Sequence, residues 1–156
     1  MTRVARYLFA ALAWAFVAGI LVQVYLIGLA LFDDSKNAQL HADFGWLLHL
    51  GPLPIVVAAA LAGAGRTRIL QGVALVVTFF FVPILAAVRA DLQVAATFHP
   101  VGAVLGFVLA IVVARGATNL ARSTDPGTPT KVVDWVIVAL VVALILFLSF
   151  SGSPEP

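Results

Sequence analysis

The residues of this sequence that could do chemistry are three histidines, His41, His49 and His99, in a chain that has no cysteine. A neutral imidazole binds transition metals through a ring nitrogen, and haem iron can take two such ligands on opposite faces of the macrocycle. His41 and His99 lie near the starts of two apolar segments that are expected to run in the same direction, which places both at a similar depth. We therefore predict a b-type haem with His41 and His99 as its iron ligands. The alternative is that both histidines hydrogen-bond to loop carbonyls.

Small and basic residues near the two histidines fit the same prediction. Gly45 and Gly102 follow the histidines by four and three positions, and Gly106 comes one turn later. A residue without a side chain lets a flat macrocycle approach the helix backbone. Arg89 is a candidate partner for an anionic haem propionate. The alternatives are that Gly102 and Gly106 serve close helix packing, and that Arg89 pairs with Asp91.

His49 lies two turns beyond His41 in the same apolar segment, which corresponds to about 12 Å along a helix and about 80° around it. It is the alternative to His41 as an iron ligand, because Pro52 and Pro54 follow closely and a kink there changes the depth of each residue. It could also orient a ligand or relay a proton. We favour a hydrogen bond across the bundle for His49, since the fourth apolar segment has no histidine at that depth.

The elements that must position these histidines are apolar enough to lie in a membrane. The chain is 63% hydrophobic and 10% charged, whereas a soluble domain has about 25% charged residues. A spanning helix needs about 20 apolar residues, and five such stretches are predicted, at 4–32, 40–65, 69–88, 99–115 and 132–150. The predicted fold is therefore all-α and integral to the membrane.

The first four predicted helices form two similar hairpins, each with a histidine near the outer start of its second helix. Two such hairpins can pack as a four-helix bundle. The predicted organisation is a bundle over 1–122, a cytoplasmic linker over 123–131, a fifth helix over 132–150 and an external tail over 151–156. Gln23 in the first helix is expected to hydrogen-bond a neighbouring helix.

Basic residues predict the orientation of the chain, because they are enriched in cytoplasmic loops. Two of the nine, Lys36 and Arg89, fall at one set of helix ends. The other seven fall at the opposite set: Arg3, Arg6, Arg66, Arg68, Arg115, Arg122 and Lys131. The N-terminus is therefore predicted to be cytoplasmic and the C-terminus external.

The fifth predicted helix is apolar on every face and has no residue of ligand type in its middle. At its inner end, Asp134 is expected to be a snorkelling or helix-cap residue and Trp135 an interfacial anchor. We expect this helix to lie outside the four-helix unit and to contact a larger membrane complex or a second copy of the chain.

Three short motifs, QVYLIG at 23–28, HADFGW at 41–46 and FHPVG at 98–102, resemble a family of small four-helix bacterial membrane proteins of unknown function. Their placement also resembles one half of haem A synthase and, more loosely, cytochrome b561-type bundles. The resemblance covers about 4–115, and it implies a bacterial plasma membrane protein with His41 and His99 as haem ligands. Haem A synthase usually has an arginine after the first histidine and a cysteine-containing outer loop, whereas this chain has Ala42 and no cysteine. These departures argue against the synthase reaction and leave simple haem binding open.

Other classes of function lack their residues. The sequence has no nucleophile triad, phosphate-binding loop, acidic metal cluster or row of carboxylates through the membrane, which argues against a stand-alone enzyme and against an ion path. We also expect no nucleic-acid partner. Electron transfer or haem handling is the first interpretation. The alternative is a cofactor-free accessory subunit of a larger membrane complex, such as a respiratory one, and a small-molecule transporter is the third.

Overall fold

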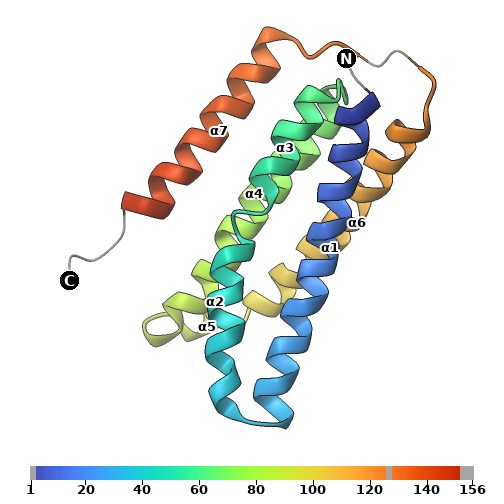
Figure 1. Cartoon of the computed structure of the whole chain (residues 1–156). Coiled ribbons are helices and arrows are strands. Elements are labelled where there is room, and N and C mark those ends of the chain that lie inside the picture. Colours follow the sequence, from blue (N-terminus) through green and yellow to red (C-terminus); the bar gives the residue numbers. More distant parts are fainter. Residues whose placement is uncertain (1–2, 126–127, 152–156) are drawn as a thin grey trace.

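The computed structural model describes residues 3–125 and 128–151. All of the regular secondary structure within these residues is helical. The elements in chain order are α1 (Arg3–Phe32), η1 (Ser35–Asn37), α2 (Ala38–Leu48), α3 (Pro52–Leu61), α4 (Arg66–Ala87), η2 (Val88–Ala90), α5 (Gln93–Ala96), α6 (His99–Arg122) and α7 (Val132–Ser151). Figure 1 shows their arrangement. The predicted all-α class is confirmed for these residues. Pro126 and Gly127 of the predicted linker and residues 152–156 of the predicted tail lie outside them.

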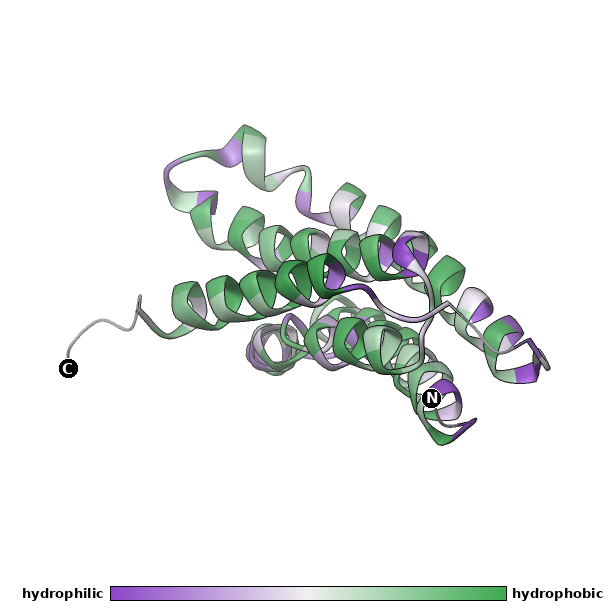
Figure 2. Cartoon of the chain, turned by 90° about the horizontal axis from the view of Figure 1, so that it is seen from above, coloured by the Kyte–Doolittle hydropathy of each residue, from purple (hydrophilic) through white to green (hydrophobic). Residues whose placement is uncertain are grey.

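Five helical stretches are long and apolar enough to cross a membrane. They are Arg3–Phe32, Ser35–Leu61, Arg66–Ala90, Gln93–Arg122 and Val132–Phe150. Figure 2 shows hydrophobic residues along the helices and hydrophilic residues gathered at their ends and in the connections. The prediction of five apolar helices is therefore confirmed.

The fourth span is longer than the sequence predicts. Arg115 and the glycine after it were expected to end it, but α6 continues to Arg122. Ala117, Leu120 and Ala121 are buried in this extension. One face of the helix therefore stays on the core for two more turns, while the Arg115 side chain is exposed.

The second span is broken, as the two prolines predict. α2 ends at Leu48, and α3 begins at Pro52, whose missing N–H is tolerated in a first helical turn. At the break, a Cβ on Gly51 would lie 2.7 Å from the Phe16 ring of α1. Glycine there lets the chain pass close to α1, and His49 lies at the same break.

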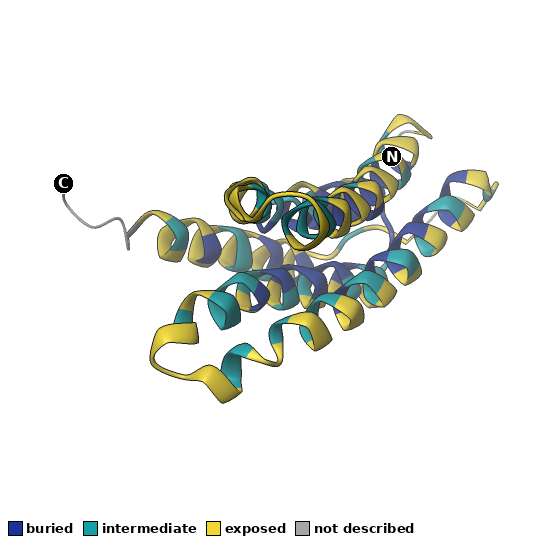
Figure 3. Cartoon of the chain, turned by 90° about the horizontal axis from the view of Figure 1, so that it is seen from below, coloured by how far each residue is buried: buried dark blue, intermediate teal, exposed yellow. Residues whose placement is uncertain are grey.

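The packed core belongs to the half of the bundle that holds the N-terminus. α1 contacts α3 and α6, and α4 contacts the same two helices, so the four close a bundle. Phe9, Ile55, Leu75 and Ala114 are each 1% exposed or less in its core. In contrast, α2 and α5 contribute no buried residue within the described chain. Figure 3 shows the exposed loops that join the helices at this less tightly packed end.

The last helix, α7, contacts α3 and α4. Figure 1 shows it inclined to the other helices, with its C-terminal end pointing away from them. Side-chain contacts join it to the bundle near both of its ends. At its start, Asp134 accepts from the Lys131 amide at 3.3 Å, as a capping residue does, and its carboxylate lies 3.7 Å from Nε of Arg66. Thr130, in the preceding linker, donates to the Ala60 carbonyl at 2.6 Å. Near its end, Ser149 contacts His49. The predicted cap is confirmed, and α7 is joined to the bundle by polar contacts that the sequence did not predict.

Candidate functional site

His41 and His99 lie next to each other in the less tightly packed half of the bundle. His41 is in the first turn of α2, and His99 is the first residue of α6. Their ring centroids are 6.4 Å apart and their planes are inclined by 79°. The structure therefore brings together the two histidines that the sequence pairs by depth.

One nitrogen of each ring has a main-chain carbonyl as its partner. Nδ1 of His41 lies 3.1 Å from the Gln23 carbonyl of α1, and Nδ1 of His99 lies 2.7 Å from the Val82 carbonyl of α4. Because a carbonyl oxygen only accepts, each Nδ1 must carry the hydrogen. Each neutral ring then keeps its lone pair on Nε2, which is the usual arrangement of a histidine that binds a metal.

Two cavities flank the histidine pair, one of about 440 Å³ and one of about 420 Å³. Both are lined by Gln23, Ile27, His41, Gly45, Pro83 and His99. The larger cavity continues toward Phe79 and Val104, and its lining is almost entirely apolar. The smaller one continues toward Arg89 and Ala87. Both cavities therefore open onto the two imidazoles.

The donor groups at these cavities are two imidazoles, those of His41 and His99. Two protein ligands are the number that a haem iron can take and fewer than a protein-only metal site uses. A protein-only metal site needs three or four ligands, and no group of three histidines or carboxylates occurs within residues 3–125 and 128–151. A macrocycle supplies its other four ligands itself.

The glycines near the histidines serve contacts other than the predicted approach of a macrocycle. A Cβ on Gly102 would lie 3.1 Å from Val82, and one on Gly106 would lie 2.7 Å from the Phe79 ring. Both glycines therefore admit side chains of α4. Gly45 lines both cavities, and a Cβ there would lie 2.7 Å from Nε2 of Gln23. Gly102 and Gly106 therefore serve the close packing of α6 on α4, which was the alternative to the approach of a macrocycle.

Arg89 lies at the edge of the smaller cavity and is exposed. Within the described ranges, no carboxylate lies within ion-pair distance of it, Asp91 included. Arg89 therefore does not form the ion pair with Asp91 that was the alternative to pairing with a haem propionate.

His49 is buried, and both of its ring nitrogens have protein partners. Nδ1 contacts the Trp46 carbonyl, and Nε2 lies 3.1 Å from Oγ of Ser149 in α7. Its ring lines neither of the two cavities among the described residues. The contact with Ser149 is the hydrogen bond across the bundle that the sequence favoured for His49. The structure does not bring His49 next to His99.

Gln23 is the residue of this site whose importance the sequence did not show. Its Nε2 donates to the His41 carbonyl at 2.7 Å, so it does bond a neighbouring helix as expected. Its Oε1 is buried without a hydrogen-bond partner in the described part of the chain. The signal available in the sequence was a glutamine in the outer part of the first apolar segment, the same part of the predicted bundle as His41 and His99.

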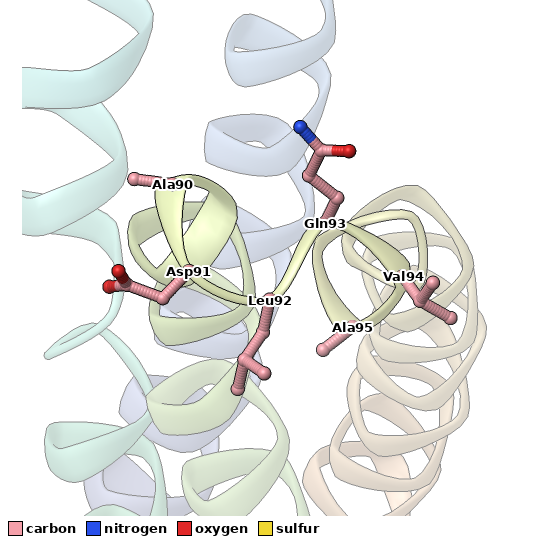
Figure 4. A pocket seen from close by; sticks show the side chains of 6 residues that line it. All are labelled: Ala90, Asp91, Leu92, Gln93, Val94 and Ala95. Carbon is pink, nitrogen blue, oxygen red and sulfur yellow. The ribbon is translucent and has the colours of Figure 1, made fainter.

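A further concavity, lined by residues 90–95, lies in the connection between η2 and α5. In Figure 4 the side chains of Asp91, Leu92, Gln93 and Val94 point in different directions instead of converging. Because one short exposed segment forms the whole lining, this loop has no site chemistry comparable to that of the histidine pair.

Comparison of the chain with protein-family models, with curated proteins and with solved structures finds no match.

Proposed function

We propose that this chain is a multi-pass membrane protein that binds one b-type haem between α2 and α6, where Nε2 of His41 and Nε2 of His99 would hold the iron. The observation that carries the proposal is the pair of imidazoles with centroids 6.4 Å apart, each with Nδ1 on a main-chain carbonyl. A haem held by these two imidazoles would supply one-electron transfer between ferric and ferrous iron.

The rest of the site has roles that follow from its position. The carbonyls of Gln23 and Val82 hold the two rings by their Nδ1 atoms. The almost entirely apolar lining of the larger cavity disfavours water there. Arg89 at the edge of the smaller cavity offers a cation for a propionate. These roles favour electron transfer or haem handling, since two protein ligands leave no open position on the metal.

We place the N-terminus in the cytoplasm and the haem in the outer half of the membrane. The support is the distribution of charge. Arg3, Arg66, Arg122 and Lys131 lie at or next to the starts of α1, α4 and α7 and the end of α6, while Lys36 and Arg89 lie at the opposite ends of the first four helices.

The test is the absorption spectrum of the full-length protein, expressed in haem-replete cells and purified in mild detergent. We expect about one haem per chain, with a Soret band that shifts when dithionite is added. A helical, monodisperse protein without these bands would contradict the proposal and would leave the accessory-subunit interpretation.

A further inference from the structure

We infer that Gln23 is a positioning residue for His41, and that the fold holds the two candidate ligand imidazoles with their planes inclined by 79°. This inference rests on the proposed haem binding and adds to it a definite orientation of the ligands. It concerns how the iron is held, and it has a spectroscopic readout of its own.

Gln23 contacts His41 twice. Its main-chain carbonyl accepts from Nδ1 of the ring at 3.1 Å, and its side-chain Nε2 donates to the main-chain carbonyl of His41 at 2.7 Å. The first contact fixes the rotation of the ring, and the second fixes the backbone from which the ring projects. One residue of α1 therefore sets both the place and the direction of the imidazole.

The orientation of the Gln23 amide follows from its partner. The atom 2.7 Å from the His41 carbonyl must be the donor, because two acceptors at that distance would repel. Oε1 is therefore the free atom. It is buried, has no partner among the described residues, and belongs to a side chain that lines both cavities. Gln23 thus touches whatever fills the cavities as well as holding His41.

Gly45 is part of the same arrangement. A Cβ at this position would lie 2.7 Å from Nε2 of Gln23, which is too close for the amide to keep its place. The absence of a side chain at Gly45 therefore admits the Gln23 amide to its bond with His41.

The crossing of the rings comes from their two acceptors. His41 is held by a carbonyl of α1, and His99 by the Val82 carbonyl of α4. The resulting interplanar angle is 79°. Crossed axial imidazoles leave the iron orbitals that interact with the ligand planes nearly equal in energy, so low-spin ferric iron gives an electron paramagnetic resonance spectrum dominated by one low-field line. Parallel imidazoles separate these orbitals and give three well-resolved lines.

The experiment is low-temperature paramagnetic resonance of the oxidised, haem-loaded full-length protein, together with its midpoint potential and haem stoichiometry. Gln23→Leu removes the amide at similar volume, and Gly45→Ala displaces it. Gln23→Glu tests rescue, because a carboxylic acid kept neutral by its apolar surroundings can still donate to the His41 carbonyl. Gln39→Leu is the matched control, since Gln39 is exposed two residues before His41 and bonds Asp43.

We expect the single low-field line in the wild type, in Gln23→Glu and in Gln39→Leu. We expect it to broaden or shift in Gln23→Leu and Gly45→Ala, with a shifted potential, because the backbone of His41 loses its amide partner while the Gln23 carbonyl still accepts from Nδ1. Loss of haem from Gln23→Leu with retention in Gln23→Glu would also support the inference. A three-line wild-type spectrum, or a Gln23→Leu spectrum identical to that of the wild type, would overturn it while leaving haem binding intact. A wild type that binds no haem would instead overturn the proposed function.

Discussion

Oγ of Ser149 lies 3.1 Å from Nε2 of His49, so the last helix reaches the buried histidine at the break between α2 and α3. The contact joins residues 100 positions apart in the sequence. It explains why His49 is buried without lining the cavities, and it connects α7 to the part of the bundle nearest to the candidate site. The two cavities beside His41 and His99 contain no described residue of α7.

Removal of residues 132–156 is therefore expected to lower thermal stability and to leave haem binding in place. His49 and Arg66 each lose a partner in this truncation, whereas the cavity lining is complete without α7. The measurement compares the haem content, unfolding temperature and detergent-corrected mass of full-length and truncated protein. A smaller assembly after truncation would show that α7 also contacts a second copy. Loss of haem would show that the α7 contacts are needed for the site.

Substitution of the histidines separates the two candidate ligand pairs. We expect His41→Ala and His99→Ala each to abolish stoichiometric haem binding, because a single axial imidazole remains. His49→Ala is expected to reduce haem content less, since its ring nitrogens already have partners in the protein. Haem content is measured by the pyridine haemochrome spectrum. The opposite pattern, in which His49→Ala removes haem and His41→Ala does not, would assign the ligands to His49 and His99.

Gly106→Ala tests the packing of α6 on α4. The added Cβ would lie 2.7 Å from the Phe79 ring, which is largely buried. We expect a loss of about 1–3 kcal/mol in the free energy of unfolding, as is usual for overpacking. Gly28→Ala is the control, because nothing lies within 4 Å of its added Cβ, and alanine there is expected to be neutral or to stabilise by up to about 1 kcal/mol. Denaturant titration in detergent measures both, and equal effects would show that the contact is not decisive.

Arg6→Met is expected to destabilise the protein through lost hydrogen bonds. The Arg6 guanidinium is buried and donates to the carbonyls of Ser123 at 3.1 Å and Asp125 at 2.7 Å. A hydrogen bond to a charged group contributes about 1.5–3 kcal/mol, so the loss should be on the order of 2–4 kcal/mol. Arg3→Met, at an exposed position on the same helix, should change stability by less than about 0.5 kcal/mol. Thermal unfolding followed by circular dichroism compares the two.

Reporter fusions test the orientation. A reporter that is active only in the cytoplasm should work when inserted near Arg66 or Ser123, and one that is active only outside should work near Lys36 or at the C-terminus. The basis is the excess of basic residues at one end of the helices. A cytoplasmic C-terminus would show that one of the five apolar helices does not cross the membrane.

The parts of this structure that depend on local composition could be predicted, and those that depend on helix packing could not. Runs of about 20 apolar residues define five helices, and Pro52 and Pro54 predict the irregularity in the second one. The partners of the His41 and His99 rings depend on how α1 and α4 are shifted along their axes. No local pattern therefore showed that the acceptors are the carbonyls of Gln23 and Val82.

The glycines near the histidines show the same limit. Their spacing could be read from the sequence, but what faces each one could not. Gly102 and Gly106 face the side chains of α4, and Gly45 faces the amide of Gln23. The spacing of small residues indicates a close approach without identifying which group approaches.

The contact of Arg6 with the end of α6 also sets an order for biosynthesis. Its acceptors, the carbonyls of Ser123 and Asp125, follow it by 117 and 119 residues. A chain made from its N-terminus cannot form this contact until four helices and part of the linker have left the ribosome. Until then the guanidinium needs water or anionic lipid headgroups around it. Burial of Arg6 therefore marks the moment at which the first and fourth apolar helices have met, and it is a late event in the assembly of the bundle.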